Sequence, residues 1–346
     1  MMSKAIALDC MGGDNSPAAH VEGAVRAVRE RGLSVILVGD GPQIEAELQR
    51  LGAADMGIPI RATTEIITGK DQPTSVVRRK KDSSLVVAHQ MVKDGEAGAA
   101  LSSGNTGALL AAGLFVIGRL PSVERPALAP MMPTRDGKGF LLLDAGATAE
   151  GKAEYILQYA IMGSMYRRLV HKVERPRVGL LNVGTEDGKG NELYRTAFPL
   201  LKNAPIDFIG NVEARDLMDG IADVVVCDGF TGNILLKSIE GAGSFFGRIL
   251  KEEMTSDARG YVGGMIASPA LKRLQQRLDY SEYGAAPMLG LKGVAFKAHG
   301  SSNALAVFRA LCIANEFIES NMVERLGQVL QEHSDAPKTE NTSTEP

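Results

Sequence analysis

Five glycine-rich polar loops are the first candidates for chemistry in this chain. Each follows a short apolar run, at 5–8, 97–101, 140–143, 178–181 and 224–227. Glycine lets the main chain approach a ligand closely, and a helix that begins after such a loop directs unpaired N–H groups and a positive dipole end at it. One such loop is also typical of an ordinary turn between a strand and a helix. Five together favour an anion site, above all for phosphate.

Familiar phosphate and nucleophile signatures are absent from these loops. The segment Gly184–Lys189 is one residue too short for a P-loop, and Gly190 stands where Ser or Thr would hold magnesium. The glycines at 39–41 are followed by Ile44 where the dinucleotide fingerprint needs Gly or Ala. No Gly-x-Ser-x-Gly elbow occurs, and the acids at strand ends lack histidines at ligand spacing. The sequence therefore predicts no cofactor, no metal and no acyl-serine mechanism.

Three single side chains remain as candidates. Lys189 lies in the most polar loop, where it either pairs with a phosphate oxygen or is solvated. His299 precedes a helical pattern at 304–317, so it either faces the ligand edge or serves as a capping or core histidine. Cys10 follows a strand, and a small buried thiol is favoured over a nucleophile there.

The elements that position these residues alternate along the chain, which indicates an α/β fold. Besides the five runs above, 35–38 and 208–210 predict strands, and helical periodicity predicts helices at 17–31, 42–51, 107–118, 152–170, 192–202 and 233–251. Strands without polar alternation are covered on both faces, so a mostly parallel sheet between helix layers is expected. In a single sheet of that kind all five loops would lie along one edge.

Composition and length limit the remaining classes. The 346 residues carry a net charge of −3, which favours neither nucleic-acid binding nor an acidic tail, and three distant cysteines form no disulfide or zinc pattern. No secretory signal is visible, and the uncharged stretch 97–118 has a polar middle that does not suit a membrane span. We therefore expect a cytoplasmic protein. Residues 1–333 are predicted to form one large domain with a helical elaboration at about 252–281, and 334–346 a disordered tail.

The loops resemble the bacterial phosphate acyltransferase family over about residues 4–332. The resemblance is carried, in one order along the chain, by the motifs around 9–14, 103–108, 180–191, 208–213, 223–233, 286–290 and 299–302. Three positions depart from the family pattern. Cys10 replaces Ala, Ala285 replaces a frequent Gly, and Thr148 replaces Asn.

The resemblance implies transfer of a fatty acyl group from acyl carrier protein to inorganic phosphate, giving acyl phosphate for phospholipid synthesis. It also implies a homodimer with the three-layer α/β/α fold shared by phosphotransacetylases and isopropylmalate dehydrogenases. Phosphate is already an anionic nucleophile, so the enzyme needs only to position it and to stabilise the oxyanion. Two alternatives stay open: a metal- and nicotinamide-dependent decarboxylating dehydrogenase of the same fold, and a non-catalytic scaffold that binds the carrier or phosphate.

Under this resemblance, Lys189 and the loop amides bind phosphate, and His299 donates to the carbonyl oxygen or the departing thiolate. The predicted catalytic residues are Lys189, Asn233 and His299. The predicted substrate-binding residues are Asp9, Gly12, Gly13, Asp14, Ser103, Gly104, Asn105, Thr106, Gly107, Asp144, Gly188, Gly190, Asn191, Asp228, Gly232 and Ser301. The amides of Asn105, Asn191 and Asn233 are assigned as hydrogen-bond donors.

Partner surfaces are predicted from charge and amphipathicity. An acidic carrier protein favours a basic surface, either Arg78–Lys81 or the group at 272–277 containing Lys272, Arg273 and Arg277, although charge runs are commonly solvated faces. Leu271, Leu274 and Leu278 share a helical face, and Tyr261, Met265 and Ile266 precede it. The segment 261–278 therefore suits either an anionic membrane surface or a second subunit.

Overall fold

The computed structural model describes residues 4–278 and 284–335, which form two sheets. The first sheet has the order β3 (Ile60–Ala62), β2 (Val35–Gly39), β1 (Ile6–Asp9), β4 (Ala99–Ser102), β12 (Val294–Ala298), β11 (Ala285–Leu289) and β5 (Ala127–Leu128). The second has the order β6 (Met131–Met132), β7 (Phe140–Leu143), β10 (Val224–Val226), β8 (Arg177–Asn182) and β9 (Asp207–Glu213). Most neighbours are parallel, while β11 is antiparallel to β12 and β5, and β6 is antiparallel to β7.

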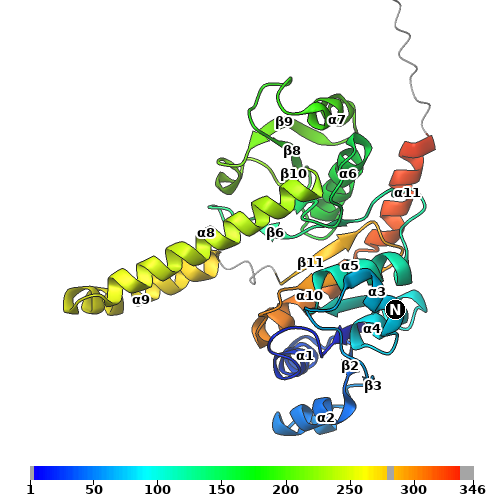
Figure 1. The fold of residues 1–346 in the computed structure, drawn as a ribbon, viewed down its shortest axis with the longest axis vertical. Coiled ribbons are helices and arrows are strands. Elements are labelled where there is room, and N and C mark those ends of the chain that lie inside the picture. Colours follow the sequence, from blue (N-terminus) through cyan, green and yellow to red (C-terminus); the bar gives the residue numbers. More distant parts are fainter. Residues whose placement is uncertain (1–3, 279–283, 336–346) are drawn as a thin grey trace, which may run out of the picture.

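Helices cover these sheets on both sides, which confirms the predicted α/β class. Around the first sheet lie α1 (Ala18–Arg31), α2 (Gly41–Arg50), α3 (Pro73–Arg79), α4 (Ser84–Lys93), α5 (Thr106–Ala112) and α10 (Ala304–Glu319), and α11 (Met322–Asp335) packs against both α10 and a helix of the second group. The second sheet packs against α6 (Ala153–Leu169) and α7 (Glu192–Lys202). Figure 1 shows these two groups one above the other, with α8 (Gly229–Thr255) and α9 (Ala258–Leu278) projecting together to one side.

The layering follows from strands that are apolar on both faces. All four residues of β1 are buried. Leu8 packs in one cluster with Val25 of α1 and Leu311 of α10, whereas Ala7 packs in another with Met91 of α4. Because successive strand side chains point to opposite faces, α1 and α10 cover one face of β1 and α4 covers the other. Burial on both faces is what the absence of polar alternation predicted.

The prediction that all five glycine-rich loops lie along one edge of one sheet is wrong. The loops after β1 and β4 belong to the first sheet, and those after β7, β8 and β10 belong to the second. Strand order depends on which apolar surfaces pack together across the whole chain, and no local pattern encodes it. The sequence reading also missed the short strands β3, β5 and β6, and it missed β11 and β12, although β12 is followed by the polar loop 299–303 and by α10.

Three further predictions concern the helical elaboration at 252–281, the uncharged stretch 97–118 and the tail at 334–346. The elaboration after residue 252 consists of the end of α8 together with α9. The uncharged stretch 97–118 is a strand, a loop and helix, as predicted. Among the described helices, none combines the length and hydropathy that a membrane crossing needs. Residues 334 and 335 end α11, and the rest of the predicted tail lies outside the described residues.

Candidate active site

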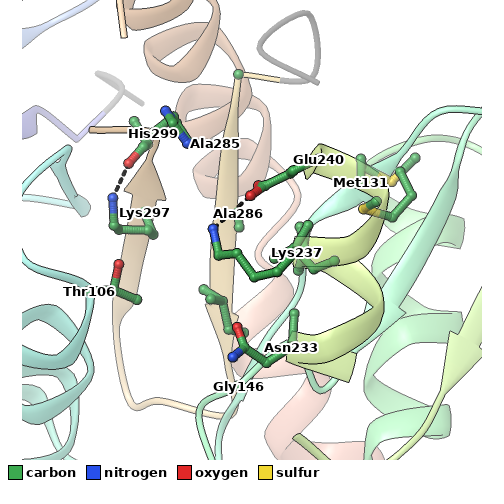
Figure 2. Close-up of a pocket in the computed structure, with 17 residues that line it drawn as sticks. Thr106, Met131, Gly146, Asn233, Lys237, Glu240, Ala285, Ala286, Lys297 and His299 are labelled. Atoms are coloured by element: carbon green, nitrogen blue, oxygen red, sulfur yellow. Dashed lines mark hydrogen bonds and ion pairs between the residues drawn. The ribbon is translucent and has the colours of Figure 1, made fainter. Parts of the chain in front are cut away.

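A cavity of about 290 Å³ lies where the two sheets meet, and both contribute side chains to it. Its polar lining consists of Thr106 from α5, Lys297 and His299 from the end of β12, and Asn233, Lys237 and Glu240 from α8. Figure 2 shows Lys297 and Thr106 on one side of the cavity and the α8 side chains on the other. The cavity therefore depends on the packing of both sheets.

Lys297 is the central cation of this cavity. It is partly buried at the end of β12, and its Nζ donates to the main-chain oxygens of Ser103, at 3.4 Å, and of Ala298. Burial, with repulsion from Lys237, lowers the pKa of Lys297 to about 8, although the charge of Asp9 opposes the shift. A cation that is held by neutral carbonyl oxygens and has lost part of its solvation is well suited to bind an anion.

Helix α8 supplies the opposite side of the cavity at helical spacing. Asn233, Lys237 and Glu240 lie about one turn apart and so share a face. The Nζ of Lys237 lies 2.7 Å from Glu240 Oε2 (Figure 2). This ion pair holds the ammonium group of Lys237 on the side of the cavity facing β12.

His299 completes the polar lining. Its Nδ1 lies 2.7 Å from Ser301 Oγ and 3.2 Å from the Ser301 main-chain nitrogen, which donates to it. Because Nδ1 accepts that hydrogen bond, the ring hydrogen of the neutral form is on Nε2. Burial and the two lysines lower the pKa of His299, while Glu240 opposes the shift. His299 is therefore a neutral donor near pH 7 that lines the cavity.

The loops after β1 and β4 build the support beneath Lys297. Asp9 is buried and its Oδ2 accepts a hydrogen bond of 2.6 Å from Ser102 Oγ, which in turn accepts from the Gly104 main-chain nitrogen. The Oγ of Ser103 lies 3.1 Å from Nε2 of His20, and burial lowers the pKa of this histidine to about 4. These contacts fix the position of Ser103, whose main-chain oxygen accepts a hydrogen bond from Lys297.

Close approach of main-chain segments explains the glycines of the loop after β1. A Cβ on Gly12 would lie 2.6 Å from Asp9 Oδ2, and Gly13 has a φ of +97°. The Asp14 main-chain nitrogen donates to Gly300 at 2.8 Å, which ties the loop after β1 to the loop of His299. Of the residues predicted in these loops, Thr106 lines the cavity, whereas Asp9, Gly12, Gly13, Asp14, Ser103, Gly104, Asn105, Gly107 and Ser301 are not among its lining residues.

The first turn of α5 is held in place by contacts of the residues on either side of Thr106. Asn105 caps this helix by accepting from the Ala108 main-chain nitrogen, and its Nδ2 donates to the carbonyl oxygen of Thr68 at 3.2 Å. A Cβ on Gly107 would lie 2.5 Å from Pro73 at the start of α3. Asn105 and Gly107 therefore position Thr106 at the cavity rather than facing it themselves.

The turn after β7 meets the first turn of α8. Asp144 is fully buried and accepts four main-chain hydrogen bonds, from residues 128, 146, 147 and 148, which oppose the desolvation that raises its pKa to about 6. Asp228 caps α8 and accepts a 2.6 Å bond from the hydroxyl of Tyr194. A Cβ on Gly232 would lie 1.9 Å from the Asp144 carbonyl oxygen. Asp144, Asp228 and Gly232 therefore fix the position of Asn233, which does line the cavity.

The loop after β8 lies outside the lining of this cavity. The Nζ of Lys189 is 3.6 Å from Glu186, and half of the lysine side chain is exposed. Asn191 caps α7, Gly190 has a φ of +94°, and an added Cβ at Gly188 would meet open space. The sequence analysis missed Lys297 and Lys237, which do line the cavity. For Lys297 a signal existed, since it follows Val294–Phe296 and precedes His299 by two residues.

The three residues that depart from the family pattern, Cys10, Thr148 and Ala285, lie in different environments. Cys10 is fully buried, and burial beside Asp9 raises the pKa of its thiol, as expected for a packing residue. The main-chain nitrogen of Thr148 donates to Asp144 at 2.8 Å, a contact that does not depend on its side chain. Ala285 lines the cavity.

Comparison with known proteins places the chain in a family. A family model described as "Fatty acid synthesis protein" matches residues 4–325. The phosphate acyltransferase of Bacillus cereus (strain G9842) is 50% identical over 330 residues, covering 95% of this chain and 99% of that protein. The phosphate acyltransferase of Halalkalibacterium halodurans is 53% identical over 319 residues, covering 92% of this chain and 94% of that protein.

Solved structures support the fold. A phosphotransacetylase from Streptococcus pyogenes superposes with a TM-score of 0.61 at 16% identity, covering 94% of this chain and 95% of that one. A branched-chain phosphotransacylase from Enterococcus faecalis V583 gives 0.56 at 14% identity, covering 91% and 99%. The overall arrangement of the two sheets thus matches the fold of these solved structures. The family model matches residues 4–325, and the two relatives are 50% and 53% identical over 95% and 92% of this chain. The chain therefore belongs to the phosphate acyltransferase family and is an acyltransferase.

Proposed function

We propose that this chain transfers a fatty acyl group from acyl carrier protein to inorganic phosphate, and that the acyl phosphate enters phospholipid synthesis. The observation that carries the proposal is the cavity between the sheets, where Lys297 and Lys237 converge beside an apolar wall. The two ammonium groups suit a phosphate dianion, and the apolar wall suits the hydrocarbon next to the thioester.

The reaction needs one displacement. A phosphate oxygen attacks the thioester carbonyl carbon, a C–O bond forms, and the C–S bond breaks with its electron pair on sulfur. We assign phosphate to Lys297, Lys237 and the amide of Asn233, and the developing oxyanion or departing thiolate to His299 Nε2–H. Lys189 and the loop amides around it remain a second predicted phosphate contact.

A turnover assay tests this function. Purified protein is mixed with palmitoyl-acyl carrier protein, with and without phosphate, while free carrier thiol is followed and acyl phosphate is trapped with hydroxylamine. We expect both products in equal amounts, only when phosphate and protein are both present. Carrier binding without thiol release would support the scaffold alternative, and reduction of a nicotinamide with a hydroxy acid would support the dehydrogenase. Faster turnover with palmitoyl coenzyme A would contradict the carrier assignment.

The basic run Arg78–Lys81 supports the carrier as donor. Arg78, Arg79 and Lys81 are exposed, and the guanidinium of Arg78 lies 5.0 Å from the Phe115 ring centre, whereas Lys80 is paired with Asp71 at 3.0 Å. Arg78 and Lys81 border a surface hollow of about 790 Å³. In the second predicted group Arg273 is exposed, while the side chains of Lys272 and Arg277 lie outside the described ones.

We also propose a cytoplasmic homodimer that contacts membranes peripherally, and α8 and α9 support the dimer. They expose a set of large apolar side chains that includes Phe245, Phe246, Tyr261, Val262, Met265 and Ile266. An apolar surface on two projecting helices is typical of an interface (Figure 1). We expect sedimentation to give a dimer and the double variant Phe246→Glu, Ile266→Glu to give a monomer. A wild-type monomer that floats with anionic vesicles would instead assign this surface to the membrane alone.

A further inference from the structure

We propose that Ala286 is the size gate of an acyl-chain subsite in the cavity, and that Leu236 forms part of the wall along which the chain lies. This inference rests on the acyl transfer to phosphate proposed above, but not on the identity of the acyl donor. It concerns which acyl groups the cavity accepts, and it is carried by the geometry around Lys297.

Ala286 is the direct cross-strand partner of Lys297 in the antiparallel pair β11–β12. Directly opposed residues point to the same face, with Cβ atoms about 5 Å apart. The methyl group of Ala286 therefore leaves open the space beside the lysine, where a larger side chain would project. In Figure 2 Ala286 lies between Lys297 and Lys237. We therefore expect an acyl group bonded to a phosphate held by these lysines to lie beside this residue.

Strand β11 provides a floor of small residues. Gly284, Ala285 and Ala286 all line the cavity, although successive strand residues point to opposite faces. The neighbouring strand β5 pairs with Met288 and Leu289, further along β11. The edge of β11 at 284–286 thus faces the cavity, which explains why consecutive residues border it. Small side chains there allow an extended hydrocarbon to lie against the strand.

Large apolar side chains form another part of the cavity lining, the wall. It consists of Leu128, Pro130, Met131 and Met132 from the β5–β6 segment and Leu236 from α8. Leu236 is only partly buried, so it keeps apolar surface that a bound chain would cover. Met131 accepts a 3.5 Å contact on its sulfur from the buried Arg167, and an unbranched thioether adapts to chains of different length.

The polar and apolar parts of the lining define an amphipathic ligand. The cationic side chains suit a phosphoryl group, and the floor and wall suit a hydrocarbon attached to it. Each methylene that a bound chain buries here should tighten binding by about fourfold. Affinity for acyl phosphates should therefore rise with chain length until the chain leaves the cavity.

Binding of non-hydrolysable acylphosphonates tests the gate without any acyl donor. Acetyl-, octanoyl- and palmitoylphosphonate are titrated by calorimetry into wild-type protein, Ala286→Phe, Leu236→Gln and the control Ala46→Phe, whose site is an exposed alanine on α2. We expect the palmitoyl-to-acetyl affinity ratio to fall at least about tenfold in Ala286→Phe, to fall about three- to fivefold in Leu236→Gln, and to stay at the wild-type value in the control. Ala286→Val, whose side chain suits a strand, replaces Ala286→Phe if the latter does not fold.

The outcomes separate the gate from the function. An unchanged ratio in folded variants at both positions would overturn the gate, since the chain would then lie elsewhere. Equal affinity of the wild type for all three lengths would overturn the acyl subsite while leaving phosphate transfer intact. If no phosphonate binds the wild type, the acyl-chain subsite fails, whereas the turnover assay described above still decides the proposed function.

Discussion

Replacing Lys297 with methionine should lower kcat/KM for phosphate by about a hundredfold or more. The variant keeps the length and most of the volume of the side chain but removes the cation from a partly buried site. Loss of one preorganised charge or donor at a reacting anion commonly costs 10²–10³ in rate, as an order of magnitude. Initial rates of acyl phosphate formation over a range of phosphate concentrations measure the effect, with circular dichroism to show that the variant is folded.

The pH dependence of the wild type provides a second readout of the same lysine. Because the pKa of Lys297 is lowered to about 8, its positive charge is lost as the pH rises through that value. Phosphate affinity should therefore fall above about pH 8, even though phosphate itself stays doubly ionised. Lys297→Arg keeps its charge at every accessible pH, so the fall should disappear in that variant.

Variants of two other lysines test whether the loss of phosphate binding is specific to Lys297. Lys202 is an exposed lysine on α7, and Lys202→Met should leave the phosphate KM at the wild-type value. Lys189→Ala should raise the phosphate KM only severalfold, because Lys189 lies outside the lining of the cavity. If Lys189→Ala were as damaging as Lys297→Met, the phosphate site would extend to the loop after β8. If Lys297→Met retained wild-type phosphate kinetics, the central role of Lys297 would be wrong.

Gly232→Ala should lower the free energy of unfolding by about 3 kcal/mol or more. The added Cβ would lie 1.9 Å from the Asp144 carbonyl oxygen and 3.0 Å from the sulfur of Cys227, and all three positions are buried. Asp144 cannot withdraw easily, because its carboxylate is fixed by four main-chain N–H groups. The first turn of α8 would have to move away from β7, taking Asn233 with it.

Urea unfolding of Gly232→Ala should be compared with Gly241→Ala on the same helix. Position 241 has nothing within 4 Å of an added Cβ, so alanine there should stabilise the protein by about 0.5–1 kcal/mol through helix propensity. Acyl phosphate formation should fall in the first variant and stay at the wild-type rate in the second. Equal stability of the two variants would show that the contact between α8 and the turn after β7 relaxes freely.

Local patterns predicted most of the longer elements and an anion site at the glycine-rich loops, although most residues of those loops do not line the cavity. The buried run Ile6–Asp9 and the periodic segment that became α1 were predicted because burial on both faces removes polar alternation and helices repeat at 3.6 residues. Asn105 and Asp228 sit at strand ends and cap the helices that follow, which is a short-range property. His299 was singled out because it precedes the helical pattern at 304–317, and it does line the cavity.

The tertiary structure decided which of those residues meet. Many glycines and acids of the five loops form supports, since hydrogen bonds such as that of Asp14 to Gly300 join segments far apart in the chain. Lys297 was missed because its importance comes from β12 pairing with β4 and from the approach of α8, neither of which a local pattern encodes. The sequence by itself determined seven strands of the two sheets and most of the longer helices, but not β3, β5, β6, β11, β12, α3 or α4. Only packing of the two sheets placed Lys237 opposite Lys297, because long-range apolar contacts set strand order and the spacing between sheets.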